Sequence, residues 1–217
     1  MKPPLLIKIC GVTTPADAVM AARSGADAVG VNLWPGSKRF AGAAARDVVA
    51  AIPRGVLKVG VFVNAAPDDI RRAVTDLGLD RVQLHGDEHA ADFFGQAGFD
   101  RAAIIRAVRV RDAASFVDQD DWSGALRLYD AFVDGFGGGG QAAPWELIAR
   151  LGVRPFLLAG GLTPENVAAA IAATTPDGVD VASGVEAAPG RKDPARVAAL
   201  VAAARAAAAS LGYSPAQ

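Results

Sequence analysis

Short aliphatic runs alternate with alanine-rich runs of helical periodicity from one end of the chain to the other. The aliphatic runs predict β-strands that are covered on both faces, because they lack a clean alternation of apolar and polar positions. The predicted strands are residues 5–10, 28–33, 56–62, 81–85, 102–110, 126–130, 156–159 and 179–183. The predicted helices are residues 15–24, 43–52, 67–77, 89–97, 112–119, 145–151, 164–173 and 194–209. The pattern therefore predicts a strict β-then-α order.

Four of the predicted helices carry a recognisable start signal. In each, a proline occupies the first helical position, where its missing N–H costs no hydrogen bond, and a cap-like or small residue precedes it. The four pairs are Thr14-Pro15, Ala66-Pro67, Thr163-Pro164 and Asp193-Pro194.

A strict β-then-α order predicts a parallel sheet built from right-handed crossover units. Eight units in 217 residues leave about 27 residues per unit, which is compact but sufficient for a closed (β/α)8 barrel. A doubly wound open sheet is the rival architecture, but it normally carries its phosphate-binding glycines after the first strand. Here the glycine-rich turns follow the seventh and eighth strands. We therefore expect an α/β fold, a (β/α)8 TIM barrel, formed as a single domain by residues 1–217.

Composition and charge narrow the classes of function. With 22 Lys and Arg against 23 Asp and Glu residues, the chain has no overall field to attract nucleic acid or an anionic membrane. The single Cys10 and the two histidines, His85 and His89, disfavour a disulfide framework and a zinc site, so we expect no metal. The sequence has neither a signal peptide's apolar core nor the roughly 20 apolar residues of a membrane span. We expect a cytoplasmic protein with no nucleic-acid or membrane partner.

The strand ends predict where the chemistry lies, because all strand C-termini of a barrel face one mouth. Polar residues at or just after these ends are Lys8, Cys10, Asn32, Asn64, Gln83, His85, Arg106, Arg109 and Asp130. One thiol, Cys10, and one carboxylate, Asp130, are the candidate proton carriers in this set. The sequence shows no Ser-His-Asp arrangement with a nucleophile elbow, and no pair of neighbouring carboxylates typical of glycoside hydrolases.

Two glycine turns follow the last two predicted strands, in the segments LAGGLTPENV and VASGVE. Glycines let backbone N–H groups approach an anion closely, and a helix N-terminus adds favourable partial charge. The loops in these two positions are also the frequent phosphate site of the fold. We therefore predict a phosphate site at Gly160, Gly161, Ser183 and Gly184. A third glycine-rich segment, residues 135–144, is predicted to be a loop on the same rim.

Several motifs, in order and across nearly the whole chain, carry a resemblance to a known family. They are KICGVT, GADAVGVNLWPGSKRF, VGVFVN, VQLHGDE, LYD with the later GGGGQ and PW, LAGGLTPENV, and GVDVASGVE with the later PGRKD. With these motifs the chain resembles phosphoribosylanthranilate isomerase, the Amadori-rearrangement enzyme of tryptophan biosynthesis. KICG and the closing SGVE and PGRKD segments are specific to that family among phosphate-binding barrels, whereas the Gly-Gly turn is shared by many of them.

The resemblance implies an aldose–ketose isomerase that acts without cofactor or metal. Its small-molecule substrate would be N-(5-phosphoribosyl)anthranilate, and its product 1-(2-carboxyphenylamino)-1-deoxyribulose 5-phosphate. In the family the KICG cysteine is the general base and an aspartate at the end of the sixth strand is the general acid, which correspond here to Cys10 and Asp130. The rival for the acid is Asp134, which follows the strand, whereas Asp130 directly ends it. Without the family context, a lone cysteine in a strand is more often a small buried hydrophobe.

The chemistry suits these two residues. A carboxyl group partly desolvated in a barrel mouth can have its pKa raised enough to protonate the ring oxygen of the furanose. A thiolate can then remove the C2′ proton, for which the pKa of Cys10 must fall below about 8.5, or the thiolate must form on substrate binding. Lys8, two residues earlier on the same strand face, is expected to contribute positive charge.

The resemblance also implies the substrate contacts. Arg39 matches the family's arginine that pairs with the anthranilate carboxylate, a partner well met by the guanidinium fork. His85 matches a position near the aromatic ring, with a structural hydrogen-bonding role as the alternative. Asp180, which matches the family's GVD, and Gln83, at the end of the fourth predicted strand, are further expected contacts at the mouth.

The chain departs from the family pattern in the loop after the sixth predicted strand. Gly139, Ala143 and Pro144 stand where the family commonly has threonine, phenylalanine and aspartate. This leaves the loop's substrate contacts open, but it removes no proton carrier.

Two other kinds of protein compete with this interpretation. A sister barrel would carry other catalysts: indole-glycerol-phosphate synthase has lysines and a glutamate on early strands, and the histidine-pathway isomerase has an aspartate where this chain has Cys10. A non-catalytic phosphosugar-binding barrel would need the glycine turns but neither Cys10 nor Asp130. A monomer and a homodimer are both compatible with the sequence.

Overall fold

Eight parallel strands close into a barrel in the order of the chain. The computed structural model describes residues 2–95, 98–117, 120–132 and 143–216. The strands are β1 (Leu6–Cys10), β2 (Ala28–Asn32), β3 (Leu57–Phe62), β4 (Arg81–Leu84), β5 (Ile104–Val110), β6 (Leu126–Ala131), β7 (Phe156–Leu158) and β8 (Gly178–Val181). The barrel closes where β1 pairs with β8, with Leu6 opposite Gly178 and Lys8 opposite Asp180. The predicted TIM barrel is confirmed, and the rival open sheet is wrong.

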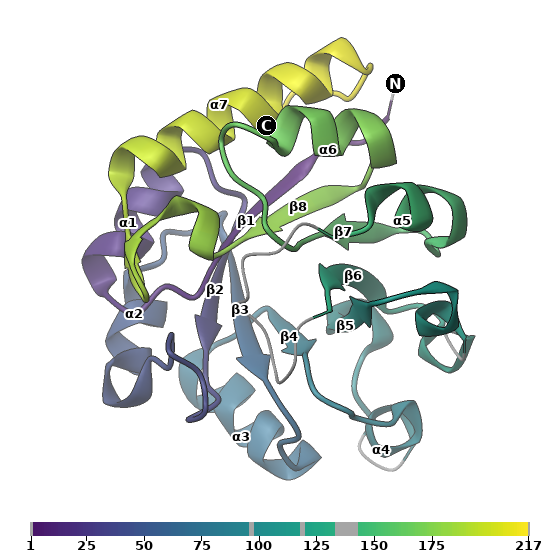
Figure 1. Ribbon diagram of the computed structural model, residues 1–217. Coiled ribbons are helices and arrows are strands. Elements are labelled where there is room, and N and C mark those ends of the chain that lie inside the picture. The colour runs from purple at the N-terminus through teal and green to yellow at the C-terminus, as the bar shows by residue number, and fades with distance from the viewer. Residues whose placement is uncertain (1, 96–97, 118–119, 133–142, 217) are drawn as a thin grey trace.

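The helices form a ring outside the strands (Figure 1). They are α1 (Pro15–Arg23), α2 (Ala45–Ala51), α3 (Pro67–Leu77), α4 (Ala90–Phe94), α5 (Trp145–Leu151), α6 (Val167–Thr174) and α7 (Pro194–Ser210). Short 3₁₀ turns are η1 (Gly42–Ala44), η2 (Arg101–Ala103), η3 (Ala113–Phe116), η4 (Asp120–Trp122) and η5 (Ser183–Val185), and a hairpin of β9 (Glu186–Ala188) and β10 (Arg191–Lys192) follows η5. Within the described ranges, no helix combines the length and apolar character that a bilayer crossing needs.

Two of the predicted helix starts are confirmed in detail. Thr14 caps α1 by accepting a hydrogen bond from the backbone N–H of Asp17 at 3.1 Å. Asp193 caps α7 through two such bonds, from Ala195 and Arg196. Ala66, which has no polar side chain, precedes α3 without a side-chain cap. In these cases the local sequence is sufficient, because a cap acts within one turn.

One helix prediction is wrong, and another helix begins later than predicted. A helix is predicted over residues 112–119, but the described part of this range, residues 112–117, contains only the single turn η3. Asp112 and Ser115 close a reciprocal capping box at the start of this turn, and the turn ends at Val117, whose backbone is extended. The helix expected from residue 164 begins at Val167 instead. There the side chain of Asn166 accepts a hydrogen bond from the backbone of Thr163 at 2.8 Å, which makes a turn of the residues in between.

The barrel has two apolar layers, and strand periodicity decides which layer a side chain enters. The interior is filled by a cluster of Ala28, Val59, Ile105, Ala107, Leu128, Leu157 and Ala159, with Leu6, Leu57 and Leu126 packed against it. The alternate residues, such as Ile7 and Ile9 in β1, belong to the larger cluster between strands and helices. A strand residue an even number of positions from an interior residue therefore faces into the barrel.

Candidate active site

The predicted proton carriers lie on the inner face of the barrel. Cys10 is four positions from the interior residue Leu6 in β1, and Asp130 is two positions from Leu128 in β6. Both stand at the C-terminal ends of their strands, where the mouth of a barrel opens. Neither side chain therefore points into the layer between strands and helices.

Lys8 forms a buried ion pair across the seam that closes the barrel. Its Nζ lies 2.7 Å from Oδ1 of Asp180 on β8, and the lysine side chain is 0% exposed. The two residues are 172 positions apart in the sequence, and they are opposite one another in the β1–β8 register. The positive charge expected near Cys10 is present, and it is paired with Asp180. Both residues lie at the base of the mouth.

Gly30 on β2 makes room for the thiol and the ammonium group together. A Cβ atom at Gly30 would lie 2.7 Å from Sγ of Cys10 and 3.0 Å from Nζ of Lys8. Both distances are shorter than real Cβ contacts, so only glycine leaves the two groups where they are. The β1–β2 register, which pairs Cys10 with Gly30, brings about this contact.

The ionisation of this group of residues is set by burial and by the two opposite charges. Burial has the largest effect and raises the pKa of the Cys10 thiol, the charge of Asp180 raises it further, and Lys8 and Lys192 lower it without cancelling the rise. Burial opposes the charge on Lys8, but Asp180 and Cys10 outweigh it and raise the lysine pKa. The sequence analysis left two routes to a thiolate open, a lowered thiol pKa and thiolate formation on substrate binding. The raised pKa of Cys10 excludes the first route.

Asp130 lies beside His85 at the opposite part of the mouth. Oδ2 of Asp130 is 3.4 Å from Nε2 of His85, which is longer than a formed hydrogen bond, and Oδ1 accepts from the backbone of Ala131 at 2.8 Å. The amide nitrogen of Gln83 lies 3.0 Å from Nδ1 of His85. The imidazole ring therefore lies between Gln83 on its Nδ1 side and Asp130 on its Nε2 side. The side chain of Asp130 is 16% exposed, so a ligand in the mouth can reach it.

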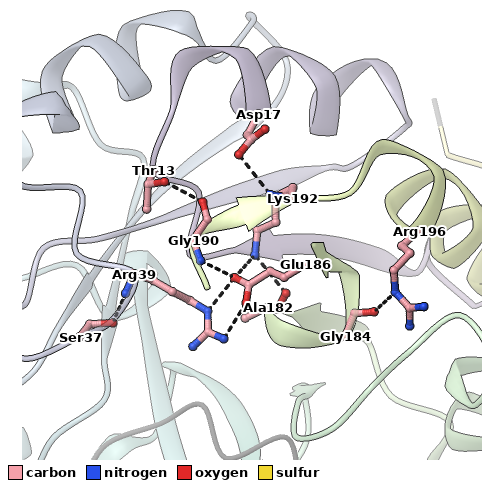
Figure 2. Close-up of polar contacts among 10 residues, drawn as sticks. All are labelled: Thr13, Asp17, Ser37, Arg39, Ala182, Gly184, Glu186, Gly190, Lys192 and Arg196. Atoms are coloured by element: carbon pink, nitrogen blue, oxygen red, sulfur yellow. Dashed lines mark hydrogen bonds and ion pairs between the residues drawn. The ribbon is translucent and has the colours of Figure 1, made fainter. Parts of the chain in front are cut away.

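The two glycine turns predicted to bind phosphate touch one another. A Cβ on Gly184 would overlap the carbonyl oxygen of Leu162, in the loop after β7. Gly160 and Gly161 both have left-handed backbone angles, with φ of 87° and 61°. In the turn after β8, Nε of Arg196 donates to the carbonyl oxygen of Gly184 at 3.0 Å (Figure 2). The four predicted residues, Ser183 included, therefore lie in two adjoining turns.

Arg39 is engaged by a residue that the sequence analysis assigned no role. Its Nε and Nη2 donate to the two carboxylate oxygens of Glu186, each at 2.7 Å (Figure 2). Nζ of Lys192 donates to Oε1 of the same carboxylate at 2.9 Å. Both Glu186 and Lys192 lie in the motif SGVE and PGRKD that carried the family resemblance, and this motif was the available signal. Sequence reasoning missed the contact of Glu186 with Arg39, because 147 residues separate the pair.

Three other polar residues that were expected at the mouth, Arg106, Asn32 and Asn64, are bound to other parts of the protein. Arg106 is one position from the interior residue Ile105, so it leaves the barrel on the helix side, where it pairs with Glu88 at 2.7 Å. Its expected place at the mouth is wrong. The side-chain oxygen of Asn32 accepts from the backbone N–H of Trp34 in the loop after β2, and that of Asn64 accepts from the backbone N–H of Asp87 in the loop after β4.

Part of the predicted rim loop lies outside the described residues. This applies to residues 135–142, and with them Asp134 and Gly139, while Ala143 and Pro144 directly precede α5. In the described part of the chain, no three His, Cys, Asp or Glu side chains gather as a metal site would require.

Comparisons with known proteins agree on one family. The family model for N-(5'phosphoribosyl)anthranilate (PRA) isomerase matches residues 7–203. The N-(5'-phosphoribosyl)anthranilate isomerase of Rubrobacter xylanophilus is 44% identical over 205 residues, which are 92% of this chain and 98% of the relative.

Solved structures of this enzyme are also similar. Phosphoribosyl anthranilate isomerase from Thermotoga maritima has a TM-score of 0.85 and 37% identity, covering 93% of this chain and 99% of that one. A structure of the isomerase in complex with reduced 1-(o-carboxyphenylamino)-1-deoxyribulose 5-phosphate has a TM-score of 0.81 and 36% identity, with the same coverage.

Proposed function

The chain belongs to the N-(5'-phosphoribosyl)anthranilate isomerase family, and we propose that Cys10 and Asp130 perform the two proton transfers of its reaction. The protein is an aldose–ketose isomerase of tryptophan biosynthesis. It converts the small molecule N-(5-phosphoribosyl)anthranilate to 1-(2-carboxyphenylamino)-1-deoxyribulose 5-phosphate by an Amadori rearrangement. The observation that supports our assignment is the position of the only thiol and of the Asp130 carboxyl on the inner face of one barrel mouth.

The first transfer opens the sugar ring. Asp130, in its protonated form, gives its proton to the ring oxygen as the bond from that oxygen to C1′ breaks. The anthranilate nitrogen supplies the electron pair that replaces this bond, and a positively charged Schiff base results. His85 flanks Asp130 at 3.4 Å, and the limited exposure of the carboxyl keeps bulk water from taking over its role.

The second transfer forms the product. Cys10, as a thiolate, takes the proton from C2′, the C2′–H electron pair forms the C1′=C2′ double bond, and the π electrons of the iminium return to the nitrogen, which gives an enolamine. The enolamine then tautomerises to the ketone. Because burial raises the pKa of the free thiol, the thiolate forms only when substrate is bound: the thiol releases its proton to solvent, and the cationic Schiff base stabilises the thiolate. Lys8 supplies a fixed positive charge on the same strand face.

The remaining assignments concern substrate binding. Backbone N–H groups of Gly160, Gly161, Ser183 and Gly184 hold the phosphate, supported by the contact between the two glycine turns. Arg39 binds the anthranilate carboxylate through the donors that Glu186 leaves open. 

Four further side chains shape the mouth around the substrate. Gln83 and His85 line it beside Asp130, while Asp180 orients Lys8 beside Cys10. No cofactor takes part in either proton transfer.

The cellular setting is also part of the proposal. We assign the protein to the cytoplasm, because the mechanism requires Cys10 as a free thiol and a reducing compartment keeps it so. Nucleic acid and membranes remain outside the set of proposed partners on the ground of the balanced charge. For the assembly, a monomer and a homodimer both stay open predictions.

Substitution of the two proton carriers tests the assignment. In Cys10→Ser and Asp130→Asn, we expect kcat to fall by about 10²- to 10⁴-fold, the usual contribution of a general acid or base. The loss of substrate fluorescence measures turnover. Asp134→Asn, the same change in the rival carboxyl, is the matched control and should keep nearly full activity. Wild-type rates in both variants, or a large loss in Asp134→Asn alone, would refute the assignment.

A further inference from the structure

Both carboxylate oxygens of Glu186 accept hydrogen bonds from the Arg39 guanidinium at the edge of the mouth. The two parallel bonds join Oε1 to Nε and Oε2 to Nη2, each at 2.7 Å. A guanidinium and a carboxylate paired in this way share one plane, so the pair fixes the orientation of the arginine as well as its position. The contact links the loop after β2 to the hairpin after β8.

Glu186 is itself held in place from the other side. Nζ of Lys192 donates to Oε1 at 2.9 Å and to the carbonyl oxygen of Ala182 at 3.0 Å, and the backbone N–H of Gly190 donates to Oε1 at 3.2 Å (Figure 2). The side chains of Glu186 and Lys192 are 5% and 0% exposed. One carboxylate thus stands between two cations, and the buried group keeps a net positive charge of one.

The two hydrogen bonds to Glu186 leave one edge of the Arg39 guanidinium available. Arginine has five N–H donors, and a carboxylate on Nε and Nη2 leaves the two on Nη1 and one on Nη2. No described residue accepts a hydrogen bond from Nη1 of Arg39, and Figure 2 shows this nitrogen turned away from Glu186. The free edge is a second fork that a second carboxylate can use.

The aliphatic part of the Arg39 side chain packs over Gly11, the residue that follows Cys10. Gly11 has a left-handed φ of 71°, and a Cβ there would overlap the side-chain carbons of Arg39. The free edge of the guanidinium is therefore held close to the reacting end of the site.

We propose that Glu186 is a positioning residue that presents the free edge of Arg39 to the aryl carboxylate of the substrate, and so sets the preference for an ortho-carboxylated arylamine. The inference rests on the proposed function, in which Arg39 binds that carboxylate. Glu186 does not touch the substrate. The negative charge of Glu186 by itself would repel the substrate carboxylate and weaken binding. The gain from the fixed orientation of Arg39 must therefore be larger than this repulsion.

Two stable ligands separate orientation from folding. One is reduced 1-(o-carboxyphenylamino)-1-deoxyribulose 5-phosphate, the ligand of the similar isomerase structure, and the other is its aniline counterpart without the ring carboxylate. Calorimetric titration gives the ratio of their dissociation constants. In wild type we expect the carboxylated ligand to bind on the order of 10- to 100-fold more tightly, the range for charge-assisted hydrogen bonds.

Glu186→Gln should lower this ratio at least about fivefold while the aniline ligand keeps its affinity, because only the carboxylated ligand uses Arg39. Arg39→Gln should bring the ratio close to one. Glu88→Gln is the matched control, because Glu88 is also buried and paired with an arginine, Arg106, but does not contact Arg39. Its ratio should equal that of wild type. Glu186→Asp, which keeps the charge but withdraws it by one methylene, gives the same test if the glutamine variant does not fold.

Several results would overturn the inference. They are an unchanged or increased ratio in both Glu186 variants, an equal loss for both ligands, or the same drop in Glu88→Gln. If Arg39→Gln loses the preference and the Glu186 variants keep it, only the role of Glu186 is refuted. If wild type binds neither ligand and does not turn over substrate, the proposed function fails first.

Discussion

At the scale of single residues, the reactivity of Cys10 depends on the opposite charges of Lys8 and Asp180 beside the thiol. Lys8 and Asp180 pair at 2.7 Å, and the net effect of burial and charge is a thiol pKa above its ordinary value. In the proposed mechanism, this raised pKa keeps the thiol protonated until substrate binds. This protects a lone buried cysteine from the reactions of a standing thiolate, because the thiolate is the reactive form.

The two charges should shift the thiol pKa in opposite directions. Lys8→Met removes the cation that favours the thiolate, so the midpoint of thiol ionisation should rise, whereas Asp180→Asn removes the anion that opposes it, so the midpoint should fall. In wild type it should lie above the reference value of about 8.5. The rate of iodoacetamide alkylation against pH measures it, and the single cysteine makes the label unambiguous.

Circular dichroism on the same samples controls for folding, since each variant leaves one buried charge without its partner. Shifts of the same sign in both variants would contradict the charge account. A wild-type midpoint below the reference value would contradict the effect of burial.

At the scale of elements, the loops after β7 and β8 act as one unit. The contact of Gly184 with the carbonyl oxygen of Leu162 leaves no space for a side chain, and Gly184 is not in the left-handed region, so its requirement is steric alone. Ordinary sheet pairing ends with the strands, and this backbone contact extends the association of β7 and β8 beyond them. A rigid pair of turns can hold phosphate without paying again to order each loop.

Gly184→Ala should therefore separate the two turns and raise KM for the phosphorylated substrate by more than about tenfold, with a smaller change in kcat. Gly55→Ala is the control. Gly55 has φ of 88° and no atom near its missing Cβ, so the substitution should cost about 1 kcal/mol of stability through backbone strain and leave KM unchanged. Steady-state kinetics and thermal unfolding of both variants measure this. An unchanged KM in Gly184→Ala would remove the adjoining turns from the phosphate site.

At the scale of the whole molecule, helix α7 ties the two ends of the chain together at the base of the barrel. Arg205 donates to the carbonyl oxygens of Leu5 and Gly25 and to both carboxylate oxygens of Asp27. Asp27 also accepts from the backbone N–H of Ile7 in β1 at 2.6 Å. One guanidinium therefore holds α7 against the starts of β1 and β2, which lie beside the closing seam.

Arg205→Ala should lower the free energy of unfolding by about 2 kcal/mol, because it leaves two carbonyl groups and a carboxylate without a charged donor. Arg72→Ala serves as the control. Arg72 pairs with Asp69 on the exposed face of α3, where such a pair contributes about 0.5 kcal/mol or less. Urea unfolding measures both. Equal effects of the two substitutions would show that the α7 contact adds no stability beyond a surface ion pair.

The sequence alone determined what depends on short-range pattern. The strand order, most of the helices, the caps of α1 and α7, and the two glycine turns follow from residues within a few positions of one another, so periodicity and capping rules predict them. Strand alternation was also sufficient to show that Arg106 and Arg109 face opposite sides, because they are three positions apart in one strand. The wrong placement of Arg106 at the mouth came from using its position along the strand and ignoring the alternation of side chains between the two faces.

Only the tertiary structure decided which distant charges meet. The pairs of Lys8 with Asp180 and of Arg39 with Glu186 join residues 172 and 147 positions apart, and no local rule selects one carboxylate among 23 acidic residues for a given cation. The direction of the Cys10 pKa shift depends on burial and on those pairs, so it too could not be read from the chain. Barrel closure is the physical reason, since it brings the first and last strands side by side and makes neighbours of residues from opposite ends of the sequence.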